Sequence, residues 1–276
     1  MQLTPDQNPN LTRHWLPSPF LKASLGFHAV AITAVTAYPS VWPWAVGAFC
    51  ANHALISAAG LVPRCSLLGP NLVRLPAAAV ARRQWALTID DGPDPDVTPQ
   101  VLDMLDRYQV KATFFCIGDR IKTYPGIARE MVRRGHAIEN HSLRHLYRFS
   151  ILGPDTMARE ISVAQDVIGS VVGERPVFFR APAGFRNPFL EPNLASMGLR
   201  LASWTRRGFD TVARDPNLVK RRLLRGFTAG DILLLHDGAA ARTSDGVAVM
   251  LKVLPAILEA AAAAGLGAVR LRDAAS

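Results

Sequence analysis

The segment LTIDDGP, residues 87–93, decides how the chain is expected to fold. It includes the end of an apolar run of strand length, Trp85–Ile89, and two carboxylates, Asp90 and Asp91, follow that run directly. A glycine and a proline then turn the chain. Because neighbouring side chains on an extended backbone point to opposite sides, we expect the two aspartates to have different roles. Taken alone, such a pair is more typical of a surface turn than of a catalytic site.

From residue 84 onward, strand-length apolar runs alternate with helix-length amphipathic stretches. Strands are predicted at Trp85–Ile89, Ala112–Ile117, His136–Glu139, Val177–Arg180, Leu199–Ser203, Ile232–Leu235 and Ala268–Leu271. Helices are predicted at Val97–Tyr108, Arg120–Arg134, Pro154–Val172, Pro188–Met197, Pro216–Arg225 and Val247–Ala264. This alternation predicts an α/β fold with a parallel sheet and helices outside it. About seven such units can close into a barrel, in which the chemistry takes place at the C-terminal ends of the strands.

Polar side chains stand at the ends of four predicted strands. Asp90 and Asp91 follow the first strand, His141 follows the third, Arg180 ends the fourth and His236 ends the sixth. Because parallel strands of a barrel end at one rim, we expect these side chains to converge. A purely structural domain has no reason to gather carboxylates, imidazoles and a guanidinium there.

His141 and His145 lie four residues apart in the segment HSLRH. On a helical turn, residues at this spacing are neighbours on one face, which suits two ligands of one metal. Alone, two such histidines are more often structural. With a carboxylate they supply a facial set that leaves positions open, as a catalytic metal requires. Imidazole nitrogens favour Zn, Co, Ni or Fe over Mg or Ca, and bound Zn lowers the pKa of its water to roughly 7.

His236 is the candidate general acid, since a histidine at a strand end beside a metal can protonate a leaving amine. A buried histidine with satisfied hydrogen bonds is the structural alternative. Asp210 is expected to orient His236 and to raise its basicity through a carboxylate–imidazole hydrogen bond.

The first 63 residues read as a membrane-associated helical hairpin. Ala23–Pro63 contains no Asp, Glu, Lys or Arg, and a proline turn flanked by tryptophans divides it into helices at about Phe20–Tyr38 and Val41–Val62. A pair of buried core helices is the alternative, kept open by His28, Asn52 and His53. Residues 64–83 are predicted to link this hairpin to a catalytic domain at 84–276.

The charge distribution favours a membrane partner. The net charge is +9, and residues 1–83 contain six lysines and arginines but one acidic residue. This excess suits acidic lipids or phosphorylated lipid carriers, and no nucleic-acid-binding signature is present, so no nucleic-acid partner is expected. Positive residues on both sides of the hairpin predict a bacterial-type inner-membrane protein with its catalytic domain on the cytoplasmic side. Three scattered cysteines do not form a disulfide framework.

Five short motifs, in order over about residues 84–271, resemble those of the polysaccharide deacetylase family, carbohydrate esterase family 4. They are Thr88–Gly92, His141–His145, Arg180–Gly184, Trp204–Thr211 and Leu234–His236. The resemblance implies a distorted (β/α) barrel of about seven strands that removes acetyl or other acyl groups from amino sugars of a polysaccharide or lipid-linked glycan.

The resemblance also implies a role for each matching residue. Asp90 would be the general base and Arg180 would pair with it, while His236 would be the general acid with Asp210 as its partner. The metal, most simply zinc, would be held by Asp91, His141 and His145. Ala183 and Gly184 would bind the substrate, with the Ala183 N–H contacting the oxyanion.

This chain departs from the family pattern in two motifs. An aromatic residue usually stands where Ala183 is, and the fourth motif has Arg207 at its usual first acidic position and Thr211 at its tryptophan position. These changes make the sugar-binding groove unusual. They keep open two alternatives: a deformylase of a lipid-linked amino sugar, and an inactive sugar-binding protein of the same fold. A metallopeptidase is disfavoured because no HExxH segment is present.

Overall fold

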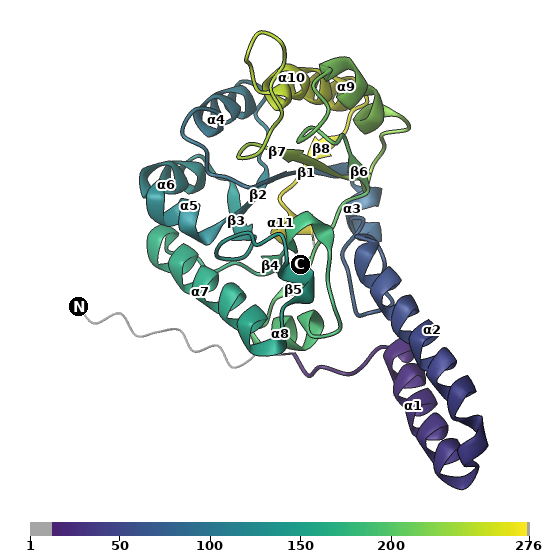
Figure 1. Ribbon diagram of the computed structural model, residues 1–276. Coiled ribbons are helices and arrows are strands. Elements are labelled where there is room, and N and C mark those ends of the chain that lie inside the picture. The colour runs from purple at the N-terminus through teal and green to yellow at the C-terminus, as the bar shows by residue number, and fades with distance from the viewer. Residues whose placement is uncertain (1–12, 275–276) are drawn as a thin grey trace.

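The computed structural model describes residues 13–274, so residues 1–12 of the predicted hairpin unit and the last two residues lie outside the described part. Eight parallel strands curl into a barrel-like sheet surrounded by helices (Figure 1). They are β1 Gln84–Asp90, β2 Thr113–Cys116, β3 Ala137–Asn140, β4 Phe178–Phe179, β5 Arg200–Leu201, β6 Arg206–Arg207, β7 Ile232–His236 and β8 Gly267–Ala268. Seven follow the order β5-β4-β3-β2-β1-β7-β6, and β8 pairs with the start of β1. The predicted parallel α/β barrel is confirmed, and β6 is the strand that the sequence did not predict.

The predicted helices are present with small changes of boundary. They are α4 Thr98–Arg107, α5 Gly118–Thr123, α6 Pro125–Arg133, α7 Pro154–Val172, α8 Leu190–Ser196, α9 Pro216–Leu224 and α10 Val249–Ala263. Short helices α3 Ala77–Ala81 and α11 Leu271–Ala274 and the 3-10 turns η2 Pro39–Val41, η3 Phe149–Ile151 and η4 Pro182–Gly184 complete the chain. The single helix expected at 120–134 is two helices, because Pro125 has no N–H to continue α5 and instead begins α6.

Alternation along the central strands decides which side chains reach the catalytic rim. On β1, Leu87 and Ile89 join the large apolar cluster beneath the surrounding helices, whereas Ala86 joins a separate cluster within the curl of the sheet. The last residue of β1, Asp90, shares the inward parity of Ala86. On β7, Leu234 belongs to the inner cluster in the same way, so His236 also faces inward.

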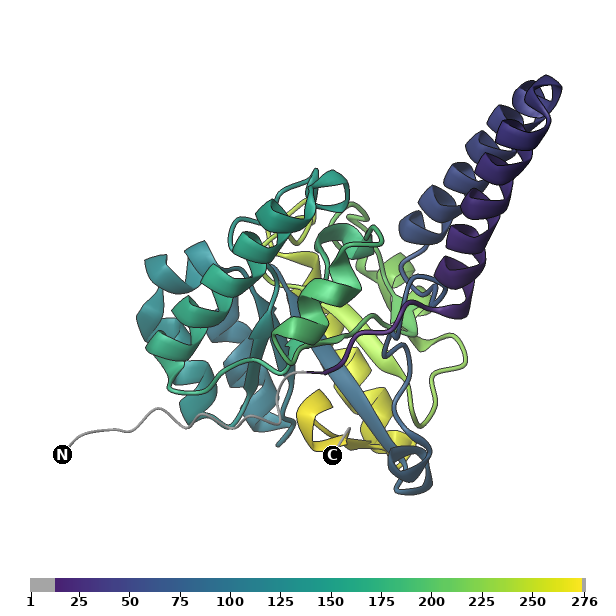
Figure 2. The same cartoon turned by 90° about the horizontal axis from the view of Figure 1, so that it is seen from below.

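The N-terminal helices α1 Pro19–Ala37 and α2 Trp42–Leu61 form a hairpin that projects from the domain (Figures 1 and 2). Both are long and apolar enough to cross a membrane, and only 17% and 11% of their apolar windows are buried. The alternative of core helices is therefore wrong. The polar residues that kept it open bind one another instead: His28 and His53 Nε2 atoms lie 3.3 Å apart, and Asn52 donates to Ser24 at 2.8 Å.

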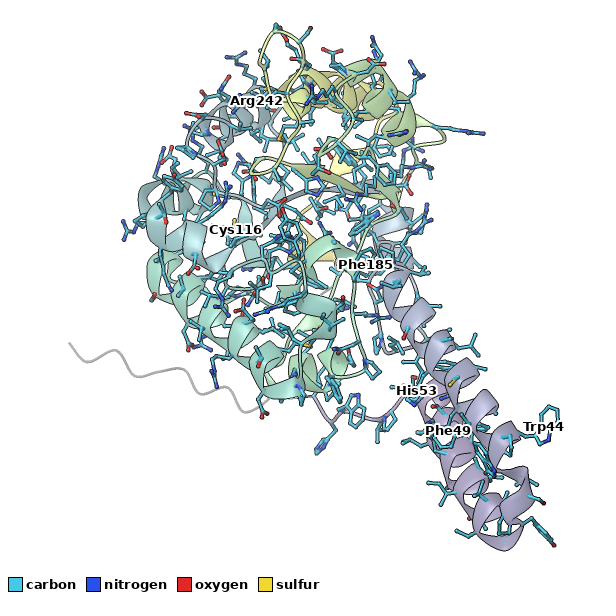
Figure 3. All side chains as sticks on the ribbon, viewed as in Figure 1. Trp44, Phe49, His53, Cys116, Phe185 and Arg242 are labelled. Carbon is cyan, nitrogen blue, oxygen red and sulfur yellow. The ribbon has the colours of Figure 1, made fainter. Side chains whose placement is uncertain are left out.

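The tip of the hairpin, where η2 joins α1 to α2 far from the barrel, carries exposed aromatic residues. Trp44 is 82% exposed and points away from the helix pair, whereas Phe49 and His53 pack against its other helix (Figure 3). Tyr38 and Trp42 are also exposed at the turn. Exposed aromatic residues at a helix-hairpin tip are typical of a membrane interface.

The predicted linker, residues 64–83, packs closely against the barrel. Leu72 forms a parallel bridge with Ala202 beside β5, and the Leu75 N–H donates to the Gly230 carbonyl just before β7. Leu75 and Ala79 belong to the inner apolar cluster. The segment thus lies between the two edges of the curled sheet and ties the hairpin to the barrel.

Candidate active site

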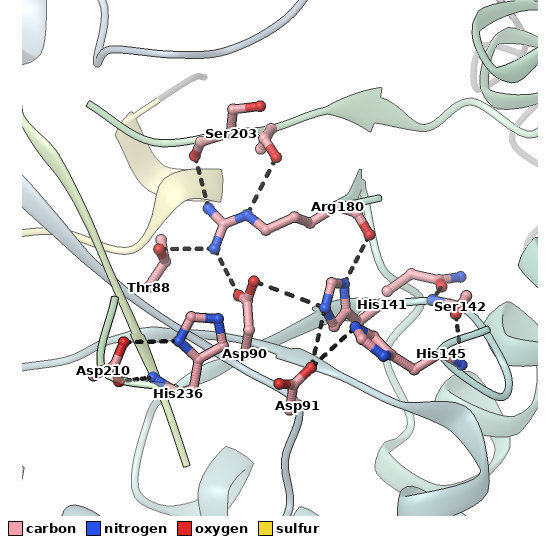
Figure 4. Close-up of polar contacts among 12 residues, drawn as sticks. Thr88, Asp90, Asp91, His141, Ser142, His145, Arg180, Ser203, Asp210 and His236 are labelled. Carbon is pink, nitrogen blue, oxygen red and sulfur yellow. Dashed lines mark hydrogen bonds and ion pairs between the residues drawn. The ribbon is translucent and has the colours of Figure 1, made fainter. Parts of the chain in front are cut away.

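Asp90 and His236 lie side by side because β1 and β7 pair in parallel with these two residues in register. Arg180 fixes the carboxylate: its Nη1 donates to Asp90 Oδ1 at 2.6 Å and to Thr88 Oγ1 at 2.9 Å (Figure 4). The other guanidinium nitrogens of this fully buried arginine donate to the carbonyls of Ala202 and Ser203. The predicted Arg180–Asp90 pair is therefore present, and Asp90 Oδ2 is left facing the pocket.

Asp91, His141 and His145 form the predicted metal-ligand cluster, with one ligand atom from each within 4.8 Å of the others. Nε2 of each histidine lies 3.3 Å from Asp91 Oδ1. Ligands of a tetrahedral Zn²⁺ at about 2.0–2.1 Å stand about 3.3 Å apart, so this spacing fits such an ion. Apart from these imidazoles, no described group hydrogen-bonds the buried Asp91 Oδ1, an orphaned oxygen that a cation would satisfy.

The ionisation of this cluster also suits a cation. Burial alone would raise the pKa of the Asp91 carboxyl, but the hydrogen bond and charge of His141, with His236 and His145, hold it well below its usual range. Burial, followed by the charge of His141, lowers the pKa of His145. A metal site needs an ionised carboxylate and neutral imidazoles, and Asp91 and His145 favour these forms. For His141, burial opposes the charged form, but the charge of Asp90 and the hydrogen bond of Asp91 raise its pKa, so a cation has to displace a proton from this imidazole.

The backbone of the histidine motif differs from the expected helical turn. Ser142 and His145 have left-handed backbone angles, with φ of 66° and 52°. Side chains take the place of helical hydrogen bonds: the Ser142 N–H donates to Asn140 Oδ1, and the His145 N–H donates to Ser142 Oγ. Glu160 on α7 accepts from the Arg144 N–H. The two imidazoles still meet, although a hydrogen-bonded loop positions them.

Asp91 is likewise turned by its backbone. Its φ is 75°, which takes it out of the strand geometry of Asp90. Its carboxylate and that of Asp90 consequently both approach His141, at 3.3 and 3.8 Å. The expected division of roles therefore rests on this turn and not on strand alternation alone.

His236 is held in its protonated form by Asp210. Its Nδ1 lies 2.9 Å from Asp210 Oδ1, and its backbone N–H donates to Asp210 Oδ2 at 2.8 Å. Burial opposes the charged form, but the charge and hydrogen bond of Asp210, aided by Asp90 and Asp91, raise the pKa of His236 to about 9. The predicted His236–Asp210 pair is present.

The sequence did not identify Asp237 as part of this region. Its Oδ2 accepts a hydrogen bond from Thr98 at 2.5 Å, and its buried Oδ1 has no partner among residues 13–274. Burial, with the nearby charges of Asp91 and Asp94, raises the pKa of Asp237 to about 7 against the Thr98 hydrogen bond. It directly follows His236, which was the available signal. A Cβ on Gly92 would stand 2.4 Å from Asp237 Oδ2, so the glycine after Asp91 makes room for it.

A pocket of about 700 Å³ opens over these residues. It is lined by seven of the nine predicted site residues: Asp90, Asp91, His141, His145, Ala183, Gly184 and His236. The other two, Arg180 and Asp210, contact Asp90 and His236 from behind. All nine therefore meet at one site.

The wall formed by Gly184 connects the pocket to the base of the hairpin. Gly184 has φ of 78°, and a Cβ there would lie 2.6 Å from the Trp204 ring and 2.7 Å from Pro63. The Ser203 hydroxyl donates to the Pro63 carbonyl, and the Arg186 N–H donates to the Gly60 carbonyl at the end of α2. The hairpin thus attaches directly to the side of the barrel on which the pocket opens.

Comparison with known proteins agrees with this geometry. The family model for polysaccharide deacetylase matches residues 77–202. A peptidoglycan-N-acetylglucosamine deacetylase of Bacillus cereus is 36% identical over 172 residues, covering 62% of this chain and 79% of that protein. The chain belongs to the polysaccharide deacetylase family. Within this family, a chitooligosaccharide deacetylase of Sinorhizobium fredii is 33% identical over 181 residues, covering 62% of this chain and 84% of that protein.

Other polysaccharide deacetylases match over different shares of their length. The peptidoglycan deacetylase PgdA of Listeria monocytogenes is 32% identical over 61% of this chain, but the match spans only 36% of that protein. Among solved structures, the peptidoglycan deacetylase PdaC of Bacillus subtilis has a TM-score of 0.61 and 28% identity, covering 69% of this chain and 90% of that one. A family 4 pseudoenzyme from Bacillus anthracis shares the fold, with a TM-score of 0.66 and 21% identity over 75% of this chain and 69% of that one.

Proposed function

We propose that this protein hydrolyses the amide of an N-acylated amino sugar, most simply an N-acetyl group, with a divalent transition metal held by Asp91, His141 and His145. The observation that carries the proposal is the placement of Asp90 and His236 in register on β1 and β7, beside that ligand cluster and within one pocket. A base, an acid and a cation site are the parts that amide hydrolysis needs.

A zinc ion in this site, or Co, Ni or Fe, would polarise the acyl carbonyl and make a water more acidic. Asp90 takes the proton of the attacking water at Oδ2, because Arg180 occupies Oδ1. The Ala183 N–H, on the η4 turn at the pocket wall, is assigned to the oxyanion. One such donor is typically worth about 10²–10³ in rate.

His236 completes the reaction by donating its proton to the departing sugar nitrogen as the C–N bond breaks. Asp210 fixes the ring through Nδ1, so Nε2 is the atom available for this transfer. The products are a carboxylate and a free amino sugar. The acyl group is tested by comparing N-acetyl and N-formyl sugars, since relatives named above act on N-acetylated glycans.

Two substitutions test the assignment of base and acid. Asp90→Asn and His236→Ala should each lower acetate release from N-acetylglucosamine oligomers by about 10²- to 10⁴-fold in purified protein with added metal. Asp96→Asn, an exposed carboxylate outside the pocket, is the matched control for loss of one acid. Near-normal turnover in either site variant, with metal content unchanged, would overturn the assignment.

The inactive alternative makes the opposite prediction. The departures at Ala183, Arg207 and Thr211 favour it, and a family 4 pseudoenzyme has the same fold. The complete acid, base and ligand set argues against it. A metal-loaded wild-type protein that binds N-acetyl sugars but releases no acyl group would establish it.

We also propose that the hairpin inserts in a membrane and leaves the catalytic domain on the cytoplasmic side. Arg13 precedes α1 and Lys22 lies in its first turn, while Arg64 and Arg74 follow α2, so both ends of the hairpin chain are positive. A cysteine at exposed Ser170, with the native cysteines replaced by serine, should resist membrane-impermeant maleimide in intact cells. Labelling from outside would show that the catalytic domain faces away from the cytoplasm, and peptidoglycan would then be the accessible substrate.

A further inference from the structure

We propose that Arg207 binds an anionic group of the substrate, a phosphate or a carboxylate, and that the protein therefore prefers acidic N-acyl amino sugars to neutral ones. The proposal rests on the hydrolase function above and names the substrate class of that site. It concerns a residue that replaces the acidic position of the family motif.

Arg207 differs sharply from its neighbour on β6. Arg206 Nε lies 2.5 Å from Asp231, and its other nitrogens donate to the carbonyls of Arg225 and Gly226. Arg207 lines the active-site pocket and has no hydrogen-bond or ion-pair partner anywhere in residues 13–274. Its Nε is buried and unsatisfied. Its two Nη nitrogens are neither buried nor hydrogen-bonded in the described chain, so at the pocket wall they are the donors that an arriving anion would pair with.

Aromatic rings hold the Arg207 guanidinium in place without neutralising it. Its central carbon lies 5.4 Å from the Trp204 ring and 4.9 Å from the Phe209 ring. Such cation–π contacts orient a guanidinium and leave its N–H groups available. Arg207 is thus positioned in advance, with its charge intact.

The other cationic arginines around the pocket are already paired. Arg120 forms an ion pair with Asp94 at 3.4 Å, and Arg144 forms one with Glu160 at 2.5 Å. Arg207 is therefore the arginine of this pocket that has no carboxylate partner in the described chain. Its position is also close to the chemistry, since it pairs with Leu234 on β7, two residues before His236.

A second hollow beside the main pocket is also lined by positively charged side chains. It shares Thr211 and Val212 with the main pocket, and Arg214 and Arg242 line it. No carboxylate is among the described residues that line this hollow. An acidic substituent on the sugar would meet Arg207 in the main pocket and Arg214 and Arg242 in the hollow, whereas the hydroxyls of a neutral glycan can accept a hydrogen bond from Arg207 but leave its charge unpaired.

Binding without turnover gives the first test. In an Asp90→Asn background, calorimetry would compare N-acetylglucosamine 1-phosphate, N-acetylmuramic acid and neutral N-acetylglucosamine as ligands. Arg207→Gln should weaken one or both acidic ligands by roughly 10- to 100-fold and change the neutral ligand little, since a charged hydrogen bond is lost. The acidic ligand whose affinity falls shows whether Arg207 binds a phosphate or a carboxylate.

Arg222→Gln is the matched control, because it removes the same charge and the same kind of contact with Phe209, at 5.3 Å, outside the pocket. It should leave all three affinities unchanged. Equal loss for neutral and acidic ligands in Arg207→Gln, or no loss for either acidic ligand, would overturn the proposal. Wild-type protein that binds the acidic ligands through Arg207 but releases no acyl group would refute the hydrolase function alone.

Discussion

Replacing Asp210 by Asn should shift the pH dependence of turnover, because Asp210 is the main group that keeps His236 protonated. Its carboxylate lies 2.9 Å from His236 Nδ1 and also accepts the His236 N–H at 2.8 Å. The pKa of His236 is raised from 6.5 to about 9. At about 1.4 kcal/mol per pH unit, the surroundings favour the imidazolium by about 3 kcal/mol.

Asn removes the charge and keeps one acceptor, so the pKa of His236 should fall by roughly two pH units. Because the acid must be protonated to act, the alkaline limb of the kcat profile should move to lower pH. At pH 8, kcat should fall by about 10- to 100-fold, while the difference narrows toward pH 6. A divalent ion bound at Asp91 would lower the pKa of His236 in wild type and variant alike. It would not change the direction of the shift between them.

The assay is acetate release between pH 5 and 10 with saturating metal, supported by an NMR titration of the His236 ring in metal-free protein. His236→Ala serves as the reference in which this alkaline limb disappears. A uniform loss of kcat at every pH, with the limb unmoved, would show that Asp210 only secures the backbone of β7 and would refute the reasoning.

Three further predictions follow from the same contacts. Chelation should abolish acyl release and lower the thermal midpoint, since an ion at 100 times its Kd stabilises by about 2.7 kcal/mol; a midpoint and a rate that are both insensitive to chelator would contradict metal binding at Asp91, His141 and His145. Gly184→Ala should cost about 1–3 kcal/mol in thermal unfolding, because its Cβ would lie 2.6 Å from Trp204 and 2.7 Å from Pro63; unchanged melting would mean that this wall relaxes freely. Asp237→Asn should stabilise the metal-free protein at neutral pH. Because the pKa of Asp237 is raised to about 7 in the folded protein, the wild type loses stability as the pH rises from about 4 to about 7, whereas the amide side chain of the variant does not titrate. Urea unfolding of both proteins at pH 4 and pH 8 checks this. An equal difference in unfolding free energy between variant and wild type at the two pH values would contradict it.

The fold was largely predictable because each central strand reads as a buried apolar run. Trp85–Ile89 and Ile232–Leu235 fall within β1 and β7. β6 was missed because Arg206–Arg207 carries no apolar pattern, and only its pairing with Leu233 and Leu234, distant in sequence, makes it a strand. Local pattern cannot reveal an element that long-range pairing creates.

The convergence of the candidate site residues was predictable, but their local geometry was not. The strand-end rule brought Asp90, Asp91 and His236 together correctly. The helical argument for His141 and His145 gave the right proximity for the wrong reason, since their loop depends on hydrogen bonds to Asn140 and other side chains that spacing does not show. Arg207 was visible only as a departure from a motif. Its lack of a partner required the structure.

The contact between Pro63 and Gly184 has a consequence for which substrates the pocket can reach. Because Gly60 near the end of α2 and Pro63 accept hydrogen bonds from Arg186 and Ser203 beside the wall that lines the pocket, a hairpin inserted in a membrane as proposed would hold the opening at a fixed height above the bilayer. A swivelling tether would let the domain sample a deep volume, whereas this joint would confine encounters to a thin layer beside that membrane. Sugars that diffuse laterally within that layer would be met repeatedly, and those farther out would not.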